Sequence, residues 1–131
     1  MHLIVDGYCS NKELLADGDK LRLWMAEITK VLGLLTFGEP RVLDYPFPGR
    51  EGTALSAVLF LGESSMTVHT YPEFSFVFID IFHCSSFDAN KALDWIAESF
   101  KMQSSRTMLL KRGIDADGQP QFASPITFGD K

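Results

Sequence analysis

Residues 54–82 read ALSAVLFLGESSMTVHTYPEFSFVFIDIF, and this stretch decides the fold. Three β-prone runs follow one another in it, with a short turn-like segment between neighbours: residues 54–61, 66–71 and 74–82. β-Branched and aromatic residues favour strands, whereas Gly, Ser and Pro favour turns. Only Ser56 interrupts the first apolar run, so that strand is expected to be buried on both faces or nearly so. The middle of the chain is therefore predicted to be a hairpin-rich sheet.

Two amphipathic helices are predicted on either side of this region. Apolar residues recur at spacings of three and four between positions 21 and 32, with Asp17 or Asp19 available as N-cap and Gly33 near the end. A second helix is predicted from about Asp88, a plausible cap, to Phe100. Each helix has one apolar side, so each is expected to pack that side against the sheet.

Shorter strands complete the prediction at residues 3–5, at 42–43 before the prolines of the 46–52 loop, and at 107–110. The tail from Asp115 is expected to be mostly irregular. Two helices and six or seven short strands fit an α+β fold, specifically a two-layer α/β sandwich with a largely antiparallel sheet and both main helices on one face. An apolar outer sheet face would then favour a homodimer, because exposed patches of that size usually mark interfaces.

Length and composition narrow the classes of function. The 131 residues suit a single domain, residues 1–131, and 46% hydrophobic against 22% charged residues indicates a folded chain. A net charge of −5 with scattered basic residues argues against a nucleic-acid partner. Two cysteines, no signal-like segment and no apolar run of about 20 residues predict a cytoplasmic protein that does not cross a membrane.

Reactive side chains are concentrated at residues 61–73. A serine in a tight turn, such as Ser64, can present its hydroxyl to the carbonyl carbon of Glu63, and an N-to-O acyl shift then gives an ester. If an imidazole removes the α-proton, β-elimination releases the Glu63 carboxylate, and hydrolysis of the dehydroalanine leaves a pyruvoyl group that can form a Schiff base with an amine. The plainer interpretation is that Ser64 and Ser65 are ordinary turn residues.

The same stretch resembles the signature of the prokaryotic S-adenosylmethionine decarboxylases, which is Glu-Ser-His, three variable residues, then His-Thr-aromatic-Pro-Glu. The chain matches it at Glu63, Ser64, His69, Thr70, Tyr71, Pro72 and Glu73. Ser65 stands where the family usually has histidine. Residues 2–6, 76–84 and 110–113 also resemble family segments in the family's order, so the resemblance covers roughly the first 113 residues.

This resemblance implies a role for each matching residue in self-processing and catalysis. Ser64 would become the covalent pyruvoyl group, and Glu63 would be the carboxyl end of the amino-terminal fragment. Ser56 matches the serine that assists processing, and His69 the histidine that promotes elimination. Cys84 matches the cysteine that returns a proton to the substrate after CO₂ leaves.

For the substrate, the resemblance implies that Tyr71 and Phe47 sandwich the adenine of S-adenosylmethionine and that Glu73 takes the ribose hydroxyls. No metal is expected, because the histidines and cysteines lack the short spacing of zinc ligands. Three alternatives stay open: the same mechanism acting on arginine or ornithine, an uncleaved regulatory homologue, and a serine hydrolase, although no Gly-x-Ser-x-Gly elbow is present. The departure at Ser65 could alter processing, the pocket or the substrate.

Overall fold

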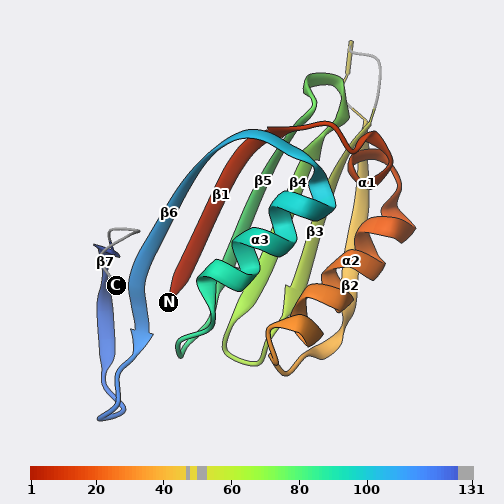
Figure 1. Ribbon diagram of the computed structural model, residues 1–131. Helices are drawn as coiled ribbons and strands as arrows, with labels where there is room; N and C mark the ends of the chain where they lie inside the picture. The colour runs from red at the N-terminus through yellow and green to blue at the C-terminus, as the bar shows by residue number, and fades with distance from the viewer. Residues whose placement is uncertain (47, 50–52, 127–131) are drawn as a thin grey trace.

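A computed structural model describes residues 1–46, 48–49 and 53–126. In these residues the chain forms a sheet of seven strands with helices on one face (Figure 1). Its elements are β1 (His2–Cys9), α1 (Lys12–Ala16), α2 (Gly18–Val31), β2 (Phe37–Pro46), β3 (Thr53–Phe60), β4 (Ser65–Tyr71), the 3₁₀ turn η1 (Pro72–Phe74), β5 (Phe76–Phe82), α3 (Ala89–Phe100), β6 (Met102–Ile114) and β7 (Pro120–Ile126). The predicted α+β sandwich with a largely antiparallel sheet is confirmed.

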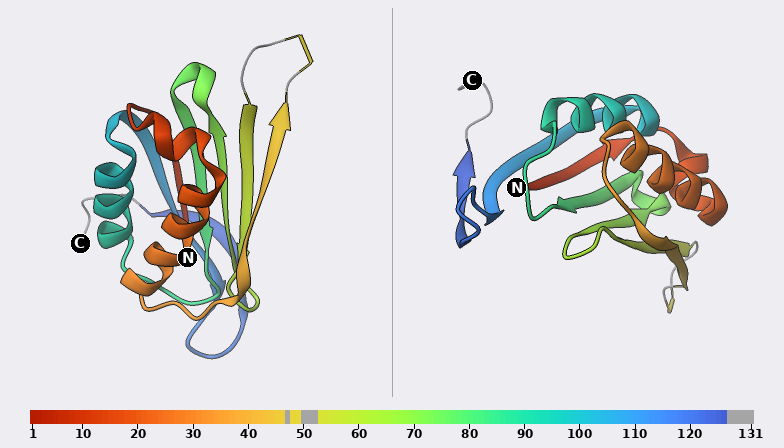
Figure 2. Two further views of the ribbon diagram at one scale, coloured as in Figure 1. Left: turned by 90° about the vertical axis from the view of Figure 1, so that its right-hand side faces the viewer. Right: turned by 90° about the horizontal axis from the view of Figure 1, so that it is seen from below.

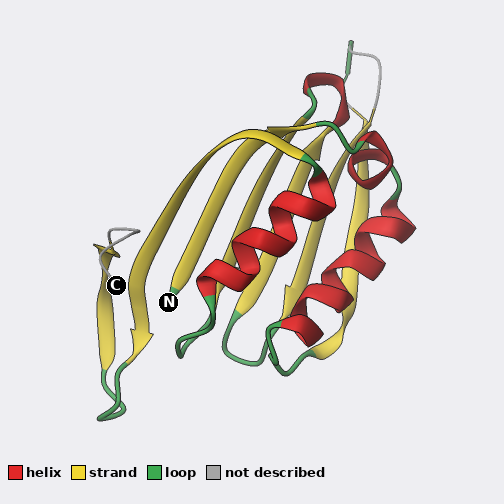
Figure 3. Cartoon of the chain, in the orientation of Figure 1, coloured by secondary structure: helices red, strands yellow, loops and turns green. Residues whose placement is uncertain are grey.

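The strands lie in the order β2-β3-β4-β5-β1-β6-β7, and every neighbouring pair is antiparallel (Figure 3). Strands β2 to β5 follow one another as hairpins, as the sequence predicted. The first strand of the chain, β1, lies between β5 and β6. Residues directly opposite one another in such a ladder share a face of the sheet, so the register determines which side chains meet.

The hydrophobic core lies between the sheet and the two longer helices (Figure 2). Asp17 caps α2 by accepting hydrogen bonds from the backbone amides of Asp19 and Lys20, and Asp88 caps α3 through the amide of Lys91. The ring centroids of Trp24 and Phe100 are 4.8 Å apart, which joins α2 to the end of α3. The caps mark where the two helices begin, and the ring contact joins the helices to each other above the core.

Several elements depart from the sequence prediction; β2 and β6, for example, are longer than the predicted residues 42–43 and 107–110. The first strand extends beyond the predicted residues 3–5. Its polar residues alternate with buried ones and lie on the face away from the helices, so they do not interrupt the strand. The helix α1 has only five residues, too few for a periodic pattern. The tail from Asp115, predicted to be mostly irregular, instead forms β7, so that prediction was wrong. Strand β7 carries Pro120 and Pro125 but lies at an edge of the sheet, where proline is tolerated.

The face of the sheet away from the helices, here called the open face, is rich in apolar side chains. Strand β3 was expected to be buried on both faces, yet Phe60 at its end is 55% exposed. The helices cover only one face in the described part of the chain, which explains the difference (Figure 2). Other exposed apolar residues on this face are Tyr8, Leu43, Tyr45, Phe78 and Met108.

Candidate active site

Ser64 lies in the tight connection between β3 and β4. The backbone amide of Leu61 donates to the carbonyl of Ser64 at 2.8 Å, which closes a loop with Gly62 and Glu63 at its tip. Gly62 has a φ of 72°, a conformation that two-residue hairpin loops require and that glycine adopts without strain. Ser64 is only 3% exposed, so the turn holds a buried hydroxyl directly after the Glu63 carbonyl.

The Ser64 hydroxyl is held by the segment that follows β5. Ser65 and Phe82 are cross-strand partners, which brings the end of β5 beside the start of β4. The backbone N–H of Cys84 donates to Ser64 Oγ at 2.7 Å. A buried hydroxyl is stable only with such a partner, so the contact between Cys84 and Ser64 fixes the serine in one orientation.

Two cavities are lined in part by the segment that carries Cys84. One, of about 470 Å³, is lined by Glu63, Cys84 and residues of the loop after α2. The other, of about 680 Å³, is lined by Cys84, Lys111, Arg112 and residues that approach or belong to β7. The thiol of Cys84 is free and partly exposed, so small molecules can reach this end of the sheet. By contrast, burial raises the pKa of the Cys9 thiol to about 11, as expected for a cysteine that packs in the core.

Ser56 and His69 form a second group on the open face. They are directly opposite one another on β3 and β4, and Ser56 Oγ lies 2.9 Å from His69 Nδ1. A cavity of about 200 Å³ surrounds the pair, and Tyr45 and Tyr71 help to line it. The serine that interrupts the apolar run is therefore bonded to the one histidine that the sequence had associated with processing.

The structure does not bring these two groups together within one chain. Ser65 and His69 are four residues apart on the extended strand β4, so their Cα atoms are separated by about 13 Å at a rise of roughly 3.3 Å per residue. An imidazole cannot span that distance to the backbone at Ser64. Ser64 and Cys84 lie together at one end of the sheet, whereas Ser56 and His69 lie farther along it.

The residues that resemble the substrate-binding set lie beyond His69 on the same strand. Tyr71 ends β4, and its ring packs edge to face against Phe78 with centroids 5.6 Å apart. Glu73 lies in η1, the turn that connects β4 to β5. Phe47 lies outside the described residues, so the predicted aromatic pair with Tyr71 stays a prediction.

Ser65, at the position where the family usually has histidine, is partly buried at the start of β4. Its cross-strand neighbours on the open face are Phe60 and Phe82. This position therefore borders the Ser64 turn and faces away from the helices.

One group beside this end of the sheet was missed by the sequence reasoning. His2 Nε2 lies 2.9 Å from a carboxylate oxygen of Asp80, and Arg112 Nη1 lies 3.2 Å from His2 Nδ1. The Arg112 guanidinium also lies over the Phe82 ring, 4.4 Å from its centroid. The alternation of polar and apolar residues in the first strand was the available signal, because it places His2 on the open face.

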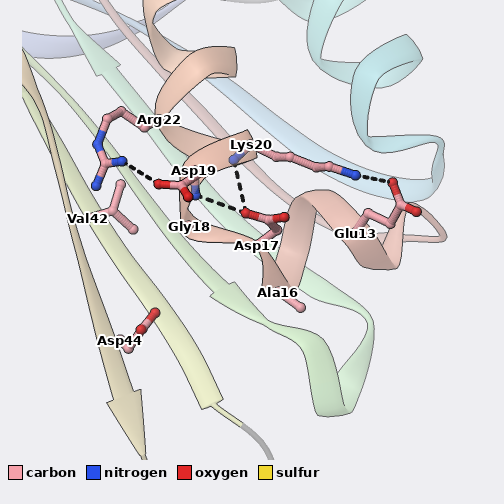
Figure 4. Close-up of a pocket in the computed structure, with 9 residues that line it drawn as sticks. All are labelled: Glu13, Ala16, Asp17, Gly18, Asp19, Lys20, Arg22, Val42 and Asp44. Carbon is pink, nitrogen blue, oxygen red and sulfur yellow. Dashed lines mark hydrogen bonds and ion pairs between the residues drawn. The ribbon is translucent and has the colours of Figure 1, made fainter.

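A polar hollow of about 570 Å³ lies elsewhere, between the amino end of α2 and β2 (Figure 4). Four of its charged groups form two ion pairs: Lys20 Nζ lies 2.6 Å from Glu13, and Arg22 lies 2.7 Å from Asp19. Asp17 is engaged as the cap of α2. The hollow is remote from Ser64 and has no part in the site described above.

Two searches of the described residues concern metals and membranes. Among residues 1–46, 48–49 and 53–126, no group of three or more His, Cys, Asp or Glu side chains is placed to hold a metal ion. Within the same residues, none of the helices has the length and apolar character needed to cross a membrane.

The chain is thus an antiparallel α+β sandwich with a buried serine directly after a glutamate in the turn between two strands. The family model described as S-adenosylmethionine decarboxylase matches residues 1–113. The chain belongs to this family.

Related proteins and a solved structure agree with this assignment. The S-adenosylmethionine decarboxylase proenzyme of Pyrococcus abyssi is 30% identical over 131 residues, covering 99% of this chain and 90% of that protein. The proenzyme of Thermococcus onnurineus is 29% identical, covering 99% of this chain and 89% of its own length. The crystal structure of the adenosylmethionine decarboxylase from Aquifex aeolicus VF5 has a TM-score of 0.69 at 20% identity, over 92% of this chain and 95% of that one, which supports the fold.

Proposed function

We propose that this chain is a self-processing, pyruvoyl-dependent enzyme that decarboxylates S-adenosylmethionine. The observation that carries the proposal is the buried Ser64 hydroxyl, held by the Cys84 N–H at 2.7 Å directly after the Glu63 carbonyl. The related proteins are named as proenzymes of this decarboxylase, which agrees with a chain that must cut itself before it can act.

Processing begins at the peptide bond between Glu63 and Ser64. Ser64 Oγ forms a bond to the Glu63 carbonyl carbon, the bond from that carbon to the Ser64 nitrogen breaks, and the hydroxyl proton ends on the freed amine. Loss of the Ser64 α-proton to a base then forms a double bond between Cα and Cβ, while the bond from Cβ to Oγ breaks and its electron pair leaves with the Glu63 carboxylate. Water replaces the nitrogen, and ammonia departs.

The residues of the site fit the group that results. A pyruvoyl group at position 64 would supply a carbonyl that condenses with an amine and accepts electrons as CO₂ leaves. Cys84, whose backbone N–H donates to Ser64 Oγ, would return a proton to the substrate carbon through its thiol, as the family resemblance implies. Tyr71 and Glu73 would contact the adenosine part, as the family resemblance implies.

A second copy of the chain would complete the site. His69 is too far along β4 to serve Ser64 of its own chain, but the open face carries the apolar surface that an isologous dimer buries. If two open faces pack together about a two-fold axis that runs across the strands, the Ser64 end of one sheet lies over the His69 end of the other. We therefore propose a homodimer in which each site uses Ser64 and Cys84 of one protomer and Ser56 and His69 of its partner.

The proposal extends to the setting of the reaction. The product, decarboxylated S-adenosylmethionine, is an aminopropyl donor, so the enzyme would serve spermidine and other polyamine synthesis. Both cysteines are free, which suits the reducing cytoplasm as the compartment.

The direct test is the intact mass of denatured protein, together with release of labelled CO₂. The wild-type chain should yield one fragment ending at Glu63 and another beginning at residue 64, the second bearing a carbonyl that reacts with borohydride or hydrazine. Ser64→Ala should stay as one intact, inactive chain. An unbroken wild-type chain without a reactive carbonyl would refute the proposal.

The same assay decides the substrate. Labelled S-adenosylmethionine, arginine and ornithine are compared at equal concentrations with the processed protein. CO₂ release from S-adenosylmethionine alone supports the proposal, whereas release from arginine or ornithine assigns the mechanism to a different amine. A processed protein that releases CO₂ from none of the three would contradict a decarboxylase role.

A further inference from the structure

Gly113 lies near the end of β6, against the backbone of Cys84. A Cβ atom added to Gly113 would lie 2.9 Å from the Cys84 carbonyl carbon and 3.1 Å from its Cα, distances at which the backbone must shift. Gly113 also has a φ of 117°, which side chains rarely adopt. Glycine is therefore the one residue that lets β6 approach Cys84 this closely.

The residue after Gly113 bonds to the same group. The backbone N–H of Ile114 donates to the Cys84 carbonyl at 2.8 Å. On its other side, the Cys84 segment is held by the His83 N–H, which donates to the Met1 carbonyl at 3.0 Å. Main-chain hydrogen bonds thus hold the Cys84 segment between β6 and Met1, the residue before β1.

The hydrogen bonds that hold Cys84 also determine where its own N–H lies relative to the Ser64 hydroxyl. The peptide unit on the amino side of Cys84 carries the N–H that donates to Ser64 Oγ, and the peptide unit on its carboxyl side carries the carbonyl held by Ile114. A shift at the carbonyl rotates the residue and moves its N–H as well. The distance from Cys84 N to Ser64 Oγ is therefore set in part by Gly113, which follows Ser64 by 49 residues along the chain.

We propose that Gly113 is a positioning residue for self-processing. Because Gly113 has no side chain, β6 can pack against the Cys84 carbonyl, and this contact orients the Cys84 main-chain N–H toward Ser64 Oγ. This inference rests on the proposed cleavage between Glu63 and Ser64. An N–H that donates to Oγ keeps the oxygen beside the Glu63 carbonyl carbon and stabilises the negative charge that Oγ gains as its proton leaves. The same donor stabilises Oγ again when it departs as part of the Glu63 carboxylate.

The test compares Gly113→Ala with Gly118→Ala. Gly118 also has a positive φ, 78°, and lies in the same β6–β7 hairpin, but a Cβ there would meet nothing within 4 Å. Both changes strain the backbone, and only the first displaces Cys84. We expect freshly synthesised Gly113→Ala to cleave about tenfold more slowly or worse per folded molecule, since losing one such donor usually costs at least that much rate. Gly118→Ala should cleave within about twofold of wild type because it leaves that donor in place.

A second pair of variants adds no atoms and so keeps the test valid if Gly113→Ala does not fold. Replacing the amide of Ile114 by an ester removes the N–H that holds the Cys84 carbonyl. The matched control is an ester at Asp115, whose N–H donates to the Gln119 carbonyl at 2.9 Å in the same hairpin. The ester at 114 should slow cleavage, and the ester at 115 should not.

Decarboxylation supplies a readout that a loss of stability alone would not give. In processed Gly113→Ala, kcat normalised to pyruvoyl content should fall while KM stays near wild type, because the Cys84 segment moves and Tyr71 and Glu73 do not. Cleavage at the wild-type rate by both Gly113→Ala and the ester at 114 would overturn the inference. A wild-type chain that never cleaves would instead refute the proposed function, so the two failures are distinguishable.

Discussion

Asp6 projects from β1 onto the open face, in cross-strand register with Phe78 on β5 and Arg106 on β6. Burial raises the pKa of its carboxyl, and the nearby Asp80 charge adds to the increase. A raised pKa in the folded state means that ionised Asp6 opposes folding at neutral pH. Stability from this group therefore grows as the pH falls through the folded-state pKa.

The expected result is that Asp6→Asn has a higher Tm than its parent at pH 7, and that the difference disappears once the pH is well below the unfolded-state pKa of about 3.9, where the carboxyl is protonated in both states. The melts should use the Ser64→Ala background so that one unbroken chain unfolds. Asp94→Asn, at an exposed position on α3, is the control and should shift Tm little at either pH. An unchanged Tm for Asp6→Asn at pH 7 would contradict the argument.

At the same scale, sequence reasoning could identify side chains but not main-chain donors. Ser56 and His69 stood out because each is unusual in its surroundings, and the structure joins them by a hydrogen bond of 2.9 Å. The partner of Ser64 could not be found in this way, because every residue except proline has a backbone N–H. Only the fold shows that the N–H of Cys84 is the one that reaches it.

Among the elements, α3 offers the sharpest test of how the sequence specifies local structure. Asp88 caps this helix by accepting a hydrogen bond from the Lys91 amide at 3.0 Å. Asp88→Ala should lower the free energy of unfolding by about 0.5–2 kcal/mol, measured by urea denaturation in the Ser64→Ala background. Asp88→Asn, which keeps an acceptor oxygen, should lose much less. Equal losses for the two variants would argue that the carboxylate charge, rather than the cap hydrogen bond, stabilises the helix.

Helices α2 and α3 and strands β3 to β5 could be predicted because each buries one face or one stripe against a single core. Strand β7 could not, since its residues contact the sheet along one edge and leave Phe122 99% exposed. An edge strand without a buried face has no apolar alternation, and its prolines resemble those of a loop. The sequence analysis allowed for a seventh strand but could not place it at residues 120–126.

For the whole molecule, the proposed sharing of the site between two protomers predicts complementation. Ser64→Ala and His69→Ala should each be inactive alone, because every site of such a dimer lacks one group. Co-expressed, half of the dimers are mixed, and one of their two sites has both Ser64 and His69. Cleavage of the His69→Ala chain should appear, with decarboxylation at about one quarter of the wild-type level. Absence of cleavage on co-expression would place both groups in a single chain's site.

The architecture as a whole could be predicted, but the separation of Ser64 from His69 could not. In the sequence the two residues are close neighbours, and a bent strand would let them meet. The register shows that β4 is extended between them and pairs continuously with β3 and β5. Residues that are only a few positions apart on an extended strand are well separated in space. The motif, which resembles a single site in the sequence, therefore lies at two places on the sheet.

The position of β1 has a consequence for the molecule after a break between residues 63 and 64. The first product would hold β1, β2 and β3, and the second β4 to β7, yet β1 is hydrogen-bonded on both sides to strands of the second product. The two pieces would thus be interleaved, and neither could dissociate without breaking the hydrogen bonds that β1 makes in the middle of the sheet. A nicked molecule should migrate as one particle in native conditions, and reassembly from isolated pieces should become a second-order reaction.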